Sequence, residues 1–273
     1  MDWAQAQSRL RDPLYAPLAP SLARLGGGEW PALEALNALA AGIANASGTQ
    51  IRFVPAREPG GKGLPHYESR VAVSGEVETR DRNWHDLFNA LAWIAFPKAK
   101  AAINAQHAAM LAEGGAAEAR HRSPPRDALS LFDEGGIAIA SSSPALLGLV
   151  LDFEWKELFW RRRGELAAKA RFVAFGHGLF EQALEPFVGL VAKSVFVPVD
   201  DFFAMLPPEA QVARVDELLA AHFAHRPRFP SPRAMAPVPV LGIPGWHPGG
   251  EHESFYDDAR HFRPKPGGRA ESP

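Results

Sequence analysis

The stretch NWHDLFNALAWIAFPKAKAAINAQH, residues 83–107, constrains the fold more than any other part of this 273-residue chain. At the 100° per residue of a helix, residues 84–95 form one apolar stripe, which consists of Trp84, Leu87, Phe88, Leu91, Ile94 and Ala95. Trp93 falls near the centre of the opposite face, beside His85 and Asn89. Because tryptophan is large and apolar, we expect protein to cover both faces of this helix. His85 and Asn89 should then border a buried or cleft-like environment, where polar groups need partners.

The first turn of this helix has a simple structural interpretation as well as a functional one. Asn83 is a natural N-cap, and Asp86 lies at the third helical position, which favours a carboxylate. The positive end of the helix dipole disfavours a charged imidazole at His85, and a neutral imidazole can act as a base or a metal ligand. A structural histidine bonded to backbone or to a carboxylate explains the same residue, and both interpretations stay open.

Phe96–Pro97 should separate this helix from a second one. On the second helix Lys100, Asn104 and His107 stack beside Ile103 and Met110. An ordinary, partly exposed face accounts for that pattern.

The rest of the chain alternates helical and strand patterns. A helix is predicted over residues 31–48 and a strand over 49–55, followed by a glycine-rich link at 58–65. Residues 67–80 read as a β-hairpin turning at Ser74–Gly75, and residues 128–141 as a second hairpin turning at Gly135–Gly136. An exposed loop is expected over residues 112–127. Further helices are expected over 141–153, 155–170 and 207–225 and within 171–186, and a buried strand over 190–199.

These elements predict an α+β fold, mainly helical, with short β-hairpins and an extended proline-rich C-terminal tail. One globular domain would span residues 31–264, including a tail that packs along it from about residue 226. An N-terminal arm, residues 1–30, would precede it, and a disordered end, residues 265–273, would follow.

Composition narrows the class of protein. The 47% hydrophobic and 22% charged residues are typical of a globular chain. A net charge of −2 argues against a dedicated nucleic-acid binder. The N-terminal residues lack the apolar core of a signal peptide, and the longest apolar segment, residues 186–199, is shorter than the ~20 residues of a membrane span. We therefore expect a soluble cytoplasmic protein with no membrane partner and a small-molecule or protein partner that the sequence does not identify.

Since the chain has no cysteine, any metal ion would need His, Asp, Glu or Asn ligands. Asp133 and Glu134 lie beside the predicted turn at Gly135–Gly136 and could hold a divalent cation, although acidic turn residues are common. His177 and Glu181 have i, i+4 spacing, so on a helix they could bind a metal or pair as a base with its orienting carboxylate. Glycines on both sides of His177 permit close approach of backbone or ligand.

Three other segments carry suggestive residues. Residues 155–163 mix aromatics with cations, for which a core stripe with a solvated arginine face is the simpler interpretation. The tail segment WHPGGEHE offers His247, Glu251, His252 and Glu253 as metal donors with loose spacing. The glycine-rich link lacks the ending of a phosphate-binding loop, and no G-x-S-x-G elbow, H-E-x-x-H helix or dinucleotide fingerprint occurs.

Long strings of the sequence resemble a known family. The stretch at residues 83–107, together with LSLFDEGG, WKELFWRRR, RFVAFGHGLFE, LGIPGW and FYDDARHFRP in that order, is similar to the bacterial domain-of-unknown-function family 3025. The resemblance extends from about Tyr67 to Pro264. It implies a soluble bacterial protein and carries no established activity, so it assigns no catalytic residue.

Two functional hypotheses follow. The first is a hydrolase-like or metal-assisted pocket around the helix at residues 84–95, with His85, Asn89, Asp86, His177 and Glu181 as catalytic candidates and His85, Asp133 and Glu134 as metal ligands. Its most specific version is a ββα nuclease finger in which the hairpin at residues 67–80 leads into that helix and His66 activates water. The second hypothesis is a non-enzymatic binding or scaffold module. The cofactor is not predicted.

Overall fold

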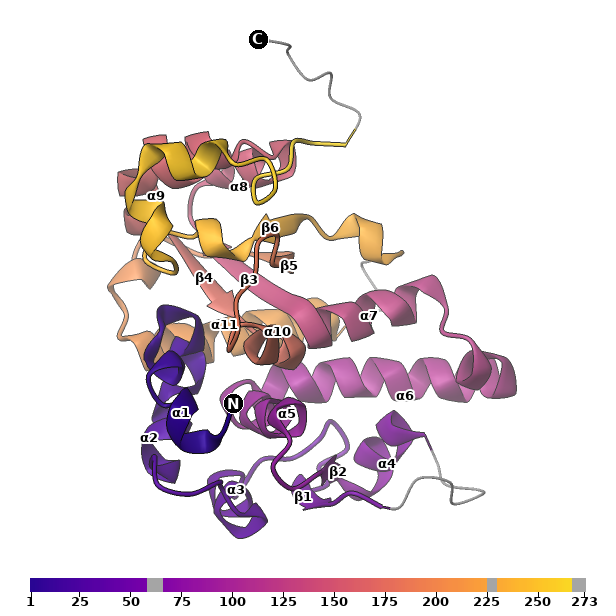
Figure 1. Ribbon diagram of the computed structural model, residues 1–273. Coiled ribbons are helices and arrows are strands. Elements are labelled where there is room, and N and C mark those ends of the chain that lie inside the picture. The colour runs from indigo at the N-terminus through magenta and orange to yellow at the C-terminus, as the bar shows by residue number, and fades with distance from the viewer. Residues whose placement is uncertain (58–65, 225–229, 267–273) are drawn as a thin grey trace.

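The computed structural model describes residues 1–57, 66–224 and 230–266. Its central element is a four-stranded sheet with the strand order β4-β3-β5-β6 (Figure 1). β3 (Gly136–Ser141) and β5 (Val191–Pro198) are parallel, whereas β4 (Ala170–Ala174) and β6 (Pro237–Pro239) run antiparallel to their neighbours. Helices outnumber strands, so the predicted α+β, mainly helical fold class is confirmed.

The sheet is covered on both faces because its strands are apolar on both sides. Ala138 and Ala140 of β3 join a core formed with three helices, α6 (Pro97–Arg120), α7 (Pro124–Gly135) and α11 (Pro208–Phe223). The alternate residues Ile137 and Ile139 join a second core, formed with α8 (Pro144–Asp152), α9 (Arg163–Lys169) and the C-terminal segment. Figure 1 shows these two layers on opposite sides of the strands.

Helix α5 (Trp84–Ala95) is covered by protein on both faces, as its sequence predicts. The Trp93 side chain is only 2% exposed. Asn83 caps the helix by accepting a hydrogen bond from the Asp86 amide at 3.0 Å, and α6 begins directly after Phe96. The N-terminal helices α1 (Trp3–Ala6) and α2 (Ala19–Leu25) lie beside α5, where the Trp3 and Trp84 rings stack at 5.7 Å.

The hairpin predicted at residues 67–80 is wrong. Its first half is the helix α4 (Tyr67–Ser74), and its second half is β2 (Glu76–Thr79), which pairs in parallel with β1 (Arg52–Pro55). Gly75 ends α4 in the left-handed region, φ 70°, where a Cβ would lie 2.1 Å from the Gln50 oxygen. The Asn45 side chain donates to the last carbonyl groups of α4, those of Val71 and Ala72. Contacts with residues distant in sequence therefore determine the secondary structure of residues 67–80. The ββα nuclease finger is also wrong, because it requires the hairpin.

Two further predictions fail for local reasons. The hairpin at residues 128–141 is wrong because residues 128–135 continue α7, where Ala128, Leu129 and Phe132 share one buried face. The loop predicted at 112–127 is wrong because this alanine-rich stretch extends α6, with a kink at Gly115, and begins α7. The helix predicted at residues 31–48 is shorter, α3 (Leu33–Leu39), and the turn after it contains Gly42 at φ 86°.

The remaining helix and strand predictions are confirmed within a few residues. The chain includes a π-helical turn, η3 (Glu157–Arg161), before α9, and a helix α10 (His177–Gln182) after β4. The short 3-10 segments are η1 (Arg9–Arg11), η2 (Pro13–Leu18), η4 (Phe203–Met205), η5 (Pro232–Ala234), η6 (Val240–Gly242), η7 (Pro248–Glu251) and η8 (Glu253–Asp257).

In the C-terminal segment Val238, Val240, Tyr256 and Phe262 are buried. The glycine-rich link at 58–65 and the end from residue 267 lie outside the described residues. Within the described ranges, every helix is too short or too polar to cross a bilayer.

Asp216 connects α11 to α6. Its carboxylate accepts hydrogen bonds from the backbone amides of Lys98 at 3.1 Å and Ala99 at 2.7 Å, which caps the start of α6. Burial has the largest effect on this side chain and raises its pKa from 3.8 to about 6, although both hydrogen bonds oppose the shift.

We therefore predict that Asp216 makes the stability of the protein depend on pH. Since its pKa is higher in the folded state than in the unfolded state, the folded protein binds more protons between these values, and the free energy of unfolding falls as the pH rises from about 4 to about 6. D216N removes the titration. Urea unfolding should show the stability advantage of wild type over D216N shrinking by up to ~3 kcal/mol across this window. An advantage that stays constant or grows would contradict the prediction.

Candidate functional site

A pocket of about 450 Å³ opens where the first turn of α5, the last turn of α7 and the first turn of α10 meet α4. Side chains from all four helices line it, together with residues of β2 and α6. Its polar lining residues include Tyr67, Glu68, His85, Asn89, Asp133, Glu134 and His177. The pocket therefore collects titratable side chains from segments far apart in the sequence.

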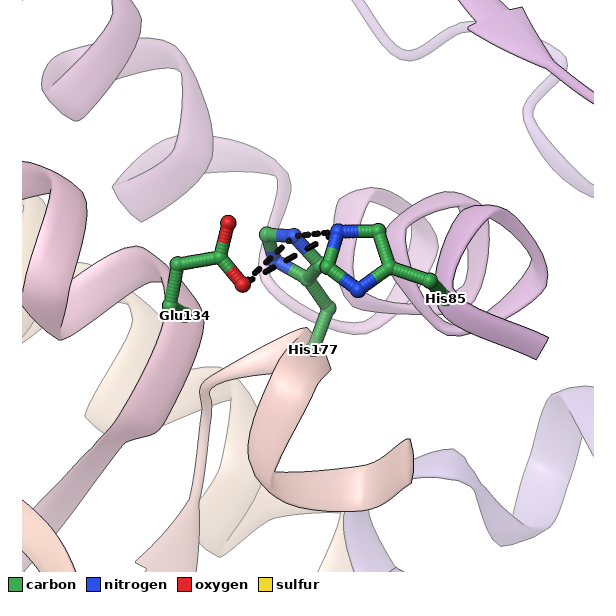
Figure 2. A group of neighbouring side chains, drawn as sticks. All are labelled: His85, Glu134 and His177. Carbon is green, nitrogen blue, oxygen red and sulfur yellow. Dashed lines mark hydrogen bonds and ion pairs between the residues drawn. The ribbon is translucent and has the colours of Figure 1, made fainter. Parts of the chain in front are cut away.

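Three of these side chains converge on one point (Figure 2). The Nε2 atoms of His85 and His177 are 3.1 Å apart, and Glu134 Oε2 lies 3.4 Å from the His177 Nε2 atom and 3.8 Å from that of His85. In this group the three candidate ligand atoms lie within 4.8 Å of one another. His177 is buried, His85 is partly buried and Glu134 is exposed, so the group lies at the wall of the pocket and solvent can reach it.

Glycines allow α10 to approach α7 this closely. A Cβ on Gly176 would lie 2.4 Å from the Glu134 carbonyl oxygen and 2.5 Å from the Gly136 amide nitrogen. A Cβ on Gly178 would lie 2.8 Å from Glu134 Oε2. The glycines on both sides of His177 thus permit a close backbone contact, as their sequence context suggested, and this contact places His177 beside Glu134.

Each imidazole turns its second nitrogen toward a carboxylate. Nδ1 of His85 is 3.0 Å from Glu181 Oε2, and Nδ1 of His177 is 3.7 Å from Asp133 Oδ2. The contact of His85 with Glu181 is a hydrogen bond, whereas the distance from His177 to Asp133 is too long for one. The His177 Nδ1 atom is therefore buried without a hydrogen-bond partner. Both rings therefore present Nε2 to the shared point while Nδ1 faces an acidic group.

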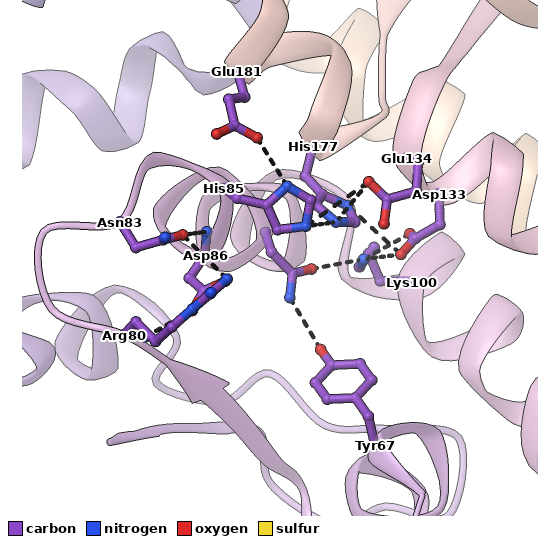
Figure 3. A network of polar contacts seen from close by, with 11 residues as sticks. Tyr67, Arg80, Asn83, His85, Asp86, Lys100, Asp133, Glu134, His177 and Glu181 are labelled. Atoms are coloured by element: carbon purple, nitrogen blue, oxygen red, sulfur yellow. Dashed lines mark hydrogen bonds and ion pairs between the residues drawn. The ribbon is translucent and has the colours of Figure 1, made fainter. Parts of the chain in front are cut away.

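A second layer of polar side chains supports the first (Figure 3). The Lys100 Nζ atom, on α6, donates to both oxygens of Asp133, at 2.6 and 2.8 Å, and to Asn89 Oδ1 at 2.9 Å. The Asn89 amide in turn donates to the Tyr67 hydroxyl at 3.0 Å. The partly exposed face predicted for Lys100, Asn104 and His107 is wrong, because all three are at most 4% exposed. Helix α4 and the end of α7 cover them.

Burial and charge act in opposite directions on the acidic groups. Burial alone would raise the pKa of Asp133, but Lys100 and His177 outweigh it and the net shift is downward. The pKa of Glu134 is likewise lowered, since the bond and charge of His177 outweigh burial. Burial raises the pKa of Glu68, whose Oε2 accepts from Asn104, and lowers that of His107 to about 4. Asp133 and Glu134 are thus ionised at neutral pH, and His107 is neutral.

The predicted site residues differ in their surroundings. Asp86 is held by Arg80, whose Nε and Nη2 atoms donate at 2.8 and 2.9 Å. Glu181 bonds to His85 and not to His177, its i, i+4 neighbour. Asp133 and Glu134 lie in the last turn of a helix and not at a hairpin tip.

The tail donors lie apart from the pocket. Within the described ranges, the one group of three potential ligands is His85, Glu134 and His177. In the tail, His247 accepts from the Gly249 amide, and Glu251 pairs with Arg163.

Sequence reasoning missed Lys100, Tyr67 and Glu68. Lys100 carried a usable signal, because it stacks with Asn104 and His107 on one face of the second helix. For the helix at residues 84–95, Trp93 indicates that a face with both polar and apolar residues is covered by protein. The same argument predicts a covered face at Lys100, Asn104 and His107. Tyr67 and Glu68 were hidden by the mistaken strand.

We predict that Gly176→Ala disrupts the site. The new Cβ meets backbone atoms of Glu134 and Gly136, which cannot rotate away, so the variant should lose about 1–3 kcal/mol of unfolding free energy. Gly148→Ala is the matched control, since a Cβ there meets nothing within 4 Å and α8 should gain about 0.5–1 kcal/mol. Urea unfolding of both variants measures the difference. Equal stability of the two would show that α10 does not depend on this contact.

Comparison with known proteins gives one result. No curated protein and no solved structure matches the chain. The family described as "Protein of unknown function (DUF3025)" matches residues 51–266, which include all the helices that build the pocket. The chain therefore belongs to this family.

Proposed function

We propose that the pocket binds a divalent transition-metal ion through His85, His177 and Glu134 and that the protein is a metal-dependent hydrolase. One observation carries the proposal: both imidazoles direct Nε2 to the point that Glu134 Oε2 also approaches. Two ligand atoms bound at ~2.0–2.1 Å to one tetrahedral zinc ion are about 3.4 Å apart. The three separations, 3.1, 3.4 and 3.8 Å, lie within a few tenths of an ångström of that value.

The outer contacts of the two histidines support the same function. Metal-binding histidines commonly donate their other ring N–H to a carboxylate, which fixes the tautomer and the ring orientation. Glu181 forms this hydrogen bond with His85 at 3.0 Å, and Asp133 Oδ2 lies 3.7 Å from the corresponding atom of His177.

The local charge also suits a dication. Asp133, Glu134 and Glu181 surround the two imidazoles, and Lys100 forms an ion pair with one of them, Asp133. Three carboxylates and one ammonium leave a formal charge of −2 when the imidazoles are neutral. The Asp86–Arg80 pair beside them is already balanced. A divalent ion would neutralise the site.

The ligand set determines the chemistry that the ion supplies. Two histidines and one carboxylate leave a coordination position open, and an ion held this way lowers the pKa of its bound water to ~7. An ion held by these residues would supply activated water for hydrolysis of an ester, amide or phosphoester. Nitrogen and oxygen ligands without sulfur suit zinc, and also iron, cobalt, nickel or manganese. Glu68, whose pKa burial raises, lines the same pocket and is a candidate proton donor to the leaving group.

Metal binding by variants tests the first half of the proposal. Titration of the metal-free protein with Zn²⁺ or Co²⁺ should give one site per chain. H85A, H177A and E134Q should each weaken it by more than ~100-fold, because even residues that only support the ligands contribute 10–100-fold. H252A, at an exposed histidine outside the pocket, is the matched control and should bind as wild type does.

Hydrolysis tests the second half. The zinc-loaded protein should accelerate cleavage of p-nitrophenyl acetate or of bis(p-nitrophenyl) phosphate, H177A should lose the activity, and H252A should keep it. Metal binding without hydrolysis of either probe would count against the hydrolase. Absence of a metal site would overturn the proposal and favour the alternative, a non-enzymatic binding module.

A further inference from the structure

We infer that Lys100, acting through Asp133, is a positioning residue that holds the ring hydrogen of His177 on Nδ1 and so leaves Nε2 as a lone pair directed at His85 and Glu134. The inference rests on the proposed metal site, to which it adds the group that prepares one ligand. The three hydrogen bonds of the Lys100 Nζ atom go to Asp133 and Asn89, and none of the three goes to a candidate ligand.

Lys100 is the buried lysine among the lysines that the structure describes. It is 4% exposed, and its Nζ atom has three hydrogen bonds, two to Asp133 and one to Asn89. It also lies 5.5 Å from the centre of the Trp93 ring. Burial of an ammonium group is expensive unless it is fully paired. These contacts satisfy the cation and fix both oxygens of Asp133 in one orientation (Figure 3).

His177 needs the acceptor that Asp133 offers. Its Nδ1 atom is buried and has no hydrogen-bond partner, and the acidic oxygen paired with it is Asp133 Oδ2 at 3.7 Å. A hydrogen on Nδ1 points at this negative oxygen and is stabilised by it. A lone pair on Nδ1 would instead face a carboxylate in a buried environment, where such repulsion is weakly screened.

The contact between the two imidazoles follows from this arrangement. Two Nε2 atoms at 3.1 Å form a hydrogen bond only when a single hydrogen lies between them. With the His177 hydrogen on Nδ1, the shared hydrogen in the metal-free protein is on His85 Nε2, in addition to the Nδ1 hydrogen that His85 donates to Glu181. Replacement of that hydrogen by an ion then leaves His177 already in the tautomer that a ligand requires.

The tautomer of His177 can be read directly. Two-bond ¹H–¹⁵N correlation spectra of the metal-free, full-length protein distinguish a hydrogen on Nδ1 from one on Nε2, and the loss of signals in His177→Ala assigns the ring. Wild type should carry the hydrogen of His177 on Nδ1. Asp133→Asn has nearly the same shape, but Lys100 will hold its amide oxygen, so the amide NH₂ faces the ring and the hydrogen should move to Nε2.

Lys100→Met tests the lysine itself. Without the ammonium group no hydrogen bond from residue 100 fixes the Asp133 oxygens toward Nδ1, so the hydrogen of His177 should again move to Nε2. Lys98→Met, on the same helix at an exposed position, is the matched control and should leave the spectrum of His177 unchanged. If Lys100→Met does not fold, Asp133→Asn still decides the question. A hydrogen on Nε2 in wild type, or an unchanged tautomer in Asp133→Asn, would overturn the inference.

Titration with Zn²⁺ separates this inference from the proposed function. Asp133→Asn should bind zinc ~10–100-fold more weakly than wild type and Lys98→Met. If wild type binds no zinc but its tautomer behaves as expected, the metal site is wrong and the positioning of His177 stands. If zinc binds and the tautomer of His177 is insensitive to Asp133, the metal site stands and the role of Lys100 is wrong.

Discussion

The contact between Gly176 and the backbone of Glu134 and Gly136 determines the geometry of the candidate site. At this point the link between β4 and α10 meets the junction of α7 and β3, and β3 and β4 are neighbouring strands of the sheet. The contact places His177 at the first position of α10, directly beside the last turn of α7. His85 completes the group because α5 packs against α10. Two short backbone segments thus bring together three side chains from three separate parts of the sequence.

The site is built from groups that are costly to bury. Lys100, Asn104, His107 and His177 are each at most 5% exposed, and a folded chain keeps such groups only when they are paired or have a function. Lys100 and Asp133 satisfy each other, whereas His177 and His107 each retain a nitrogen without a hydrogen-bond partner. Unsatisfied buried nitrogens beside a solvent-accessible pocket are the kind of local cost that functional sites carry.

Sequence patterns predicted the elements that depend on local information. Helix α5, its asparagine cap and its two covered faces follow from residues 83–95 alone. The hairpin prediction failed at α4 because this helix and its end at Gly75 depend on Asn45 and Gln50, about two dozen residues away. The periodicity of the sequence does not reveal such contacts. The candidate site depends both on local sequence information and on contacts between distant segments. Its individual residues stand out by type and spacing, but His85 and His177 are 92 residues apart, and only the packing of α10 on α5 and α7 brings them together. Lys100 was recognisable by the covered-face argument, but its pairing with Asp133 was not.

The most direct test of the central claim is a crystal structure of the protein grown with zinc, with anomalous diffraction recorded on both sides of the zinc absorption edge. Our account predicts one strong anomalous peak in the pocket, with His85 Nε2, His177 Nε2 and a Glu134 oxygen at ~2.0–2.2 Å from it. A zinc-containing crystal in which these three side chains hold no ion, and the two imidazoles remain hydrogen-bonded to each other, would contradict the account.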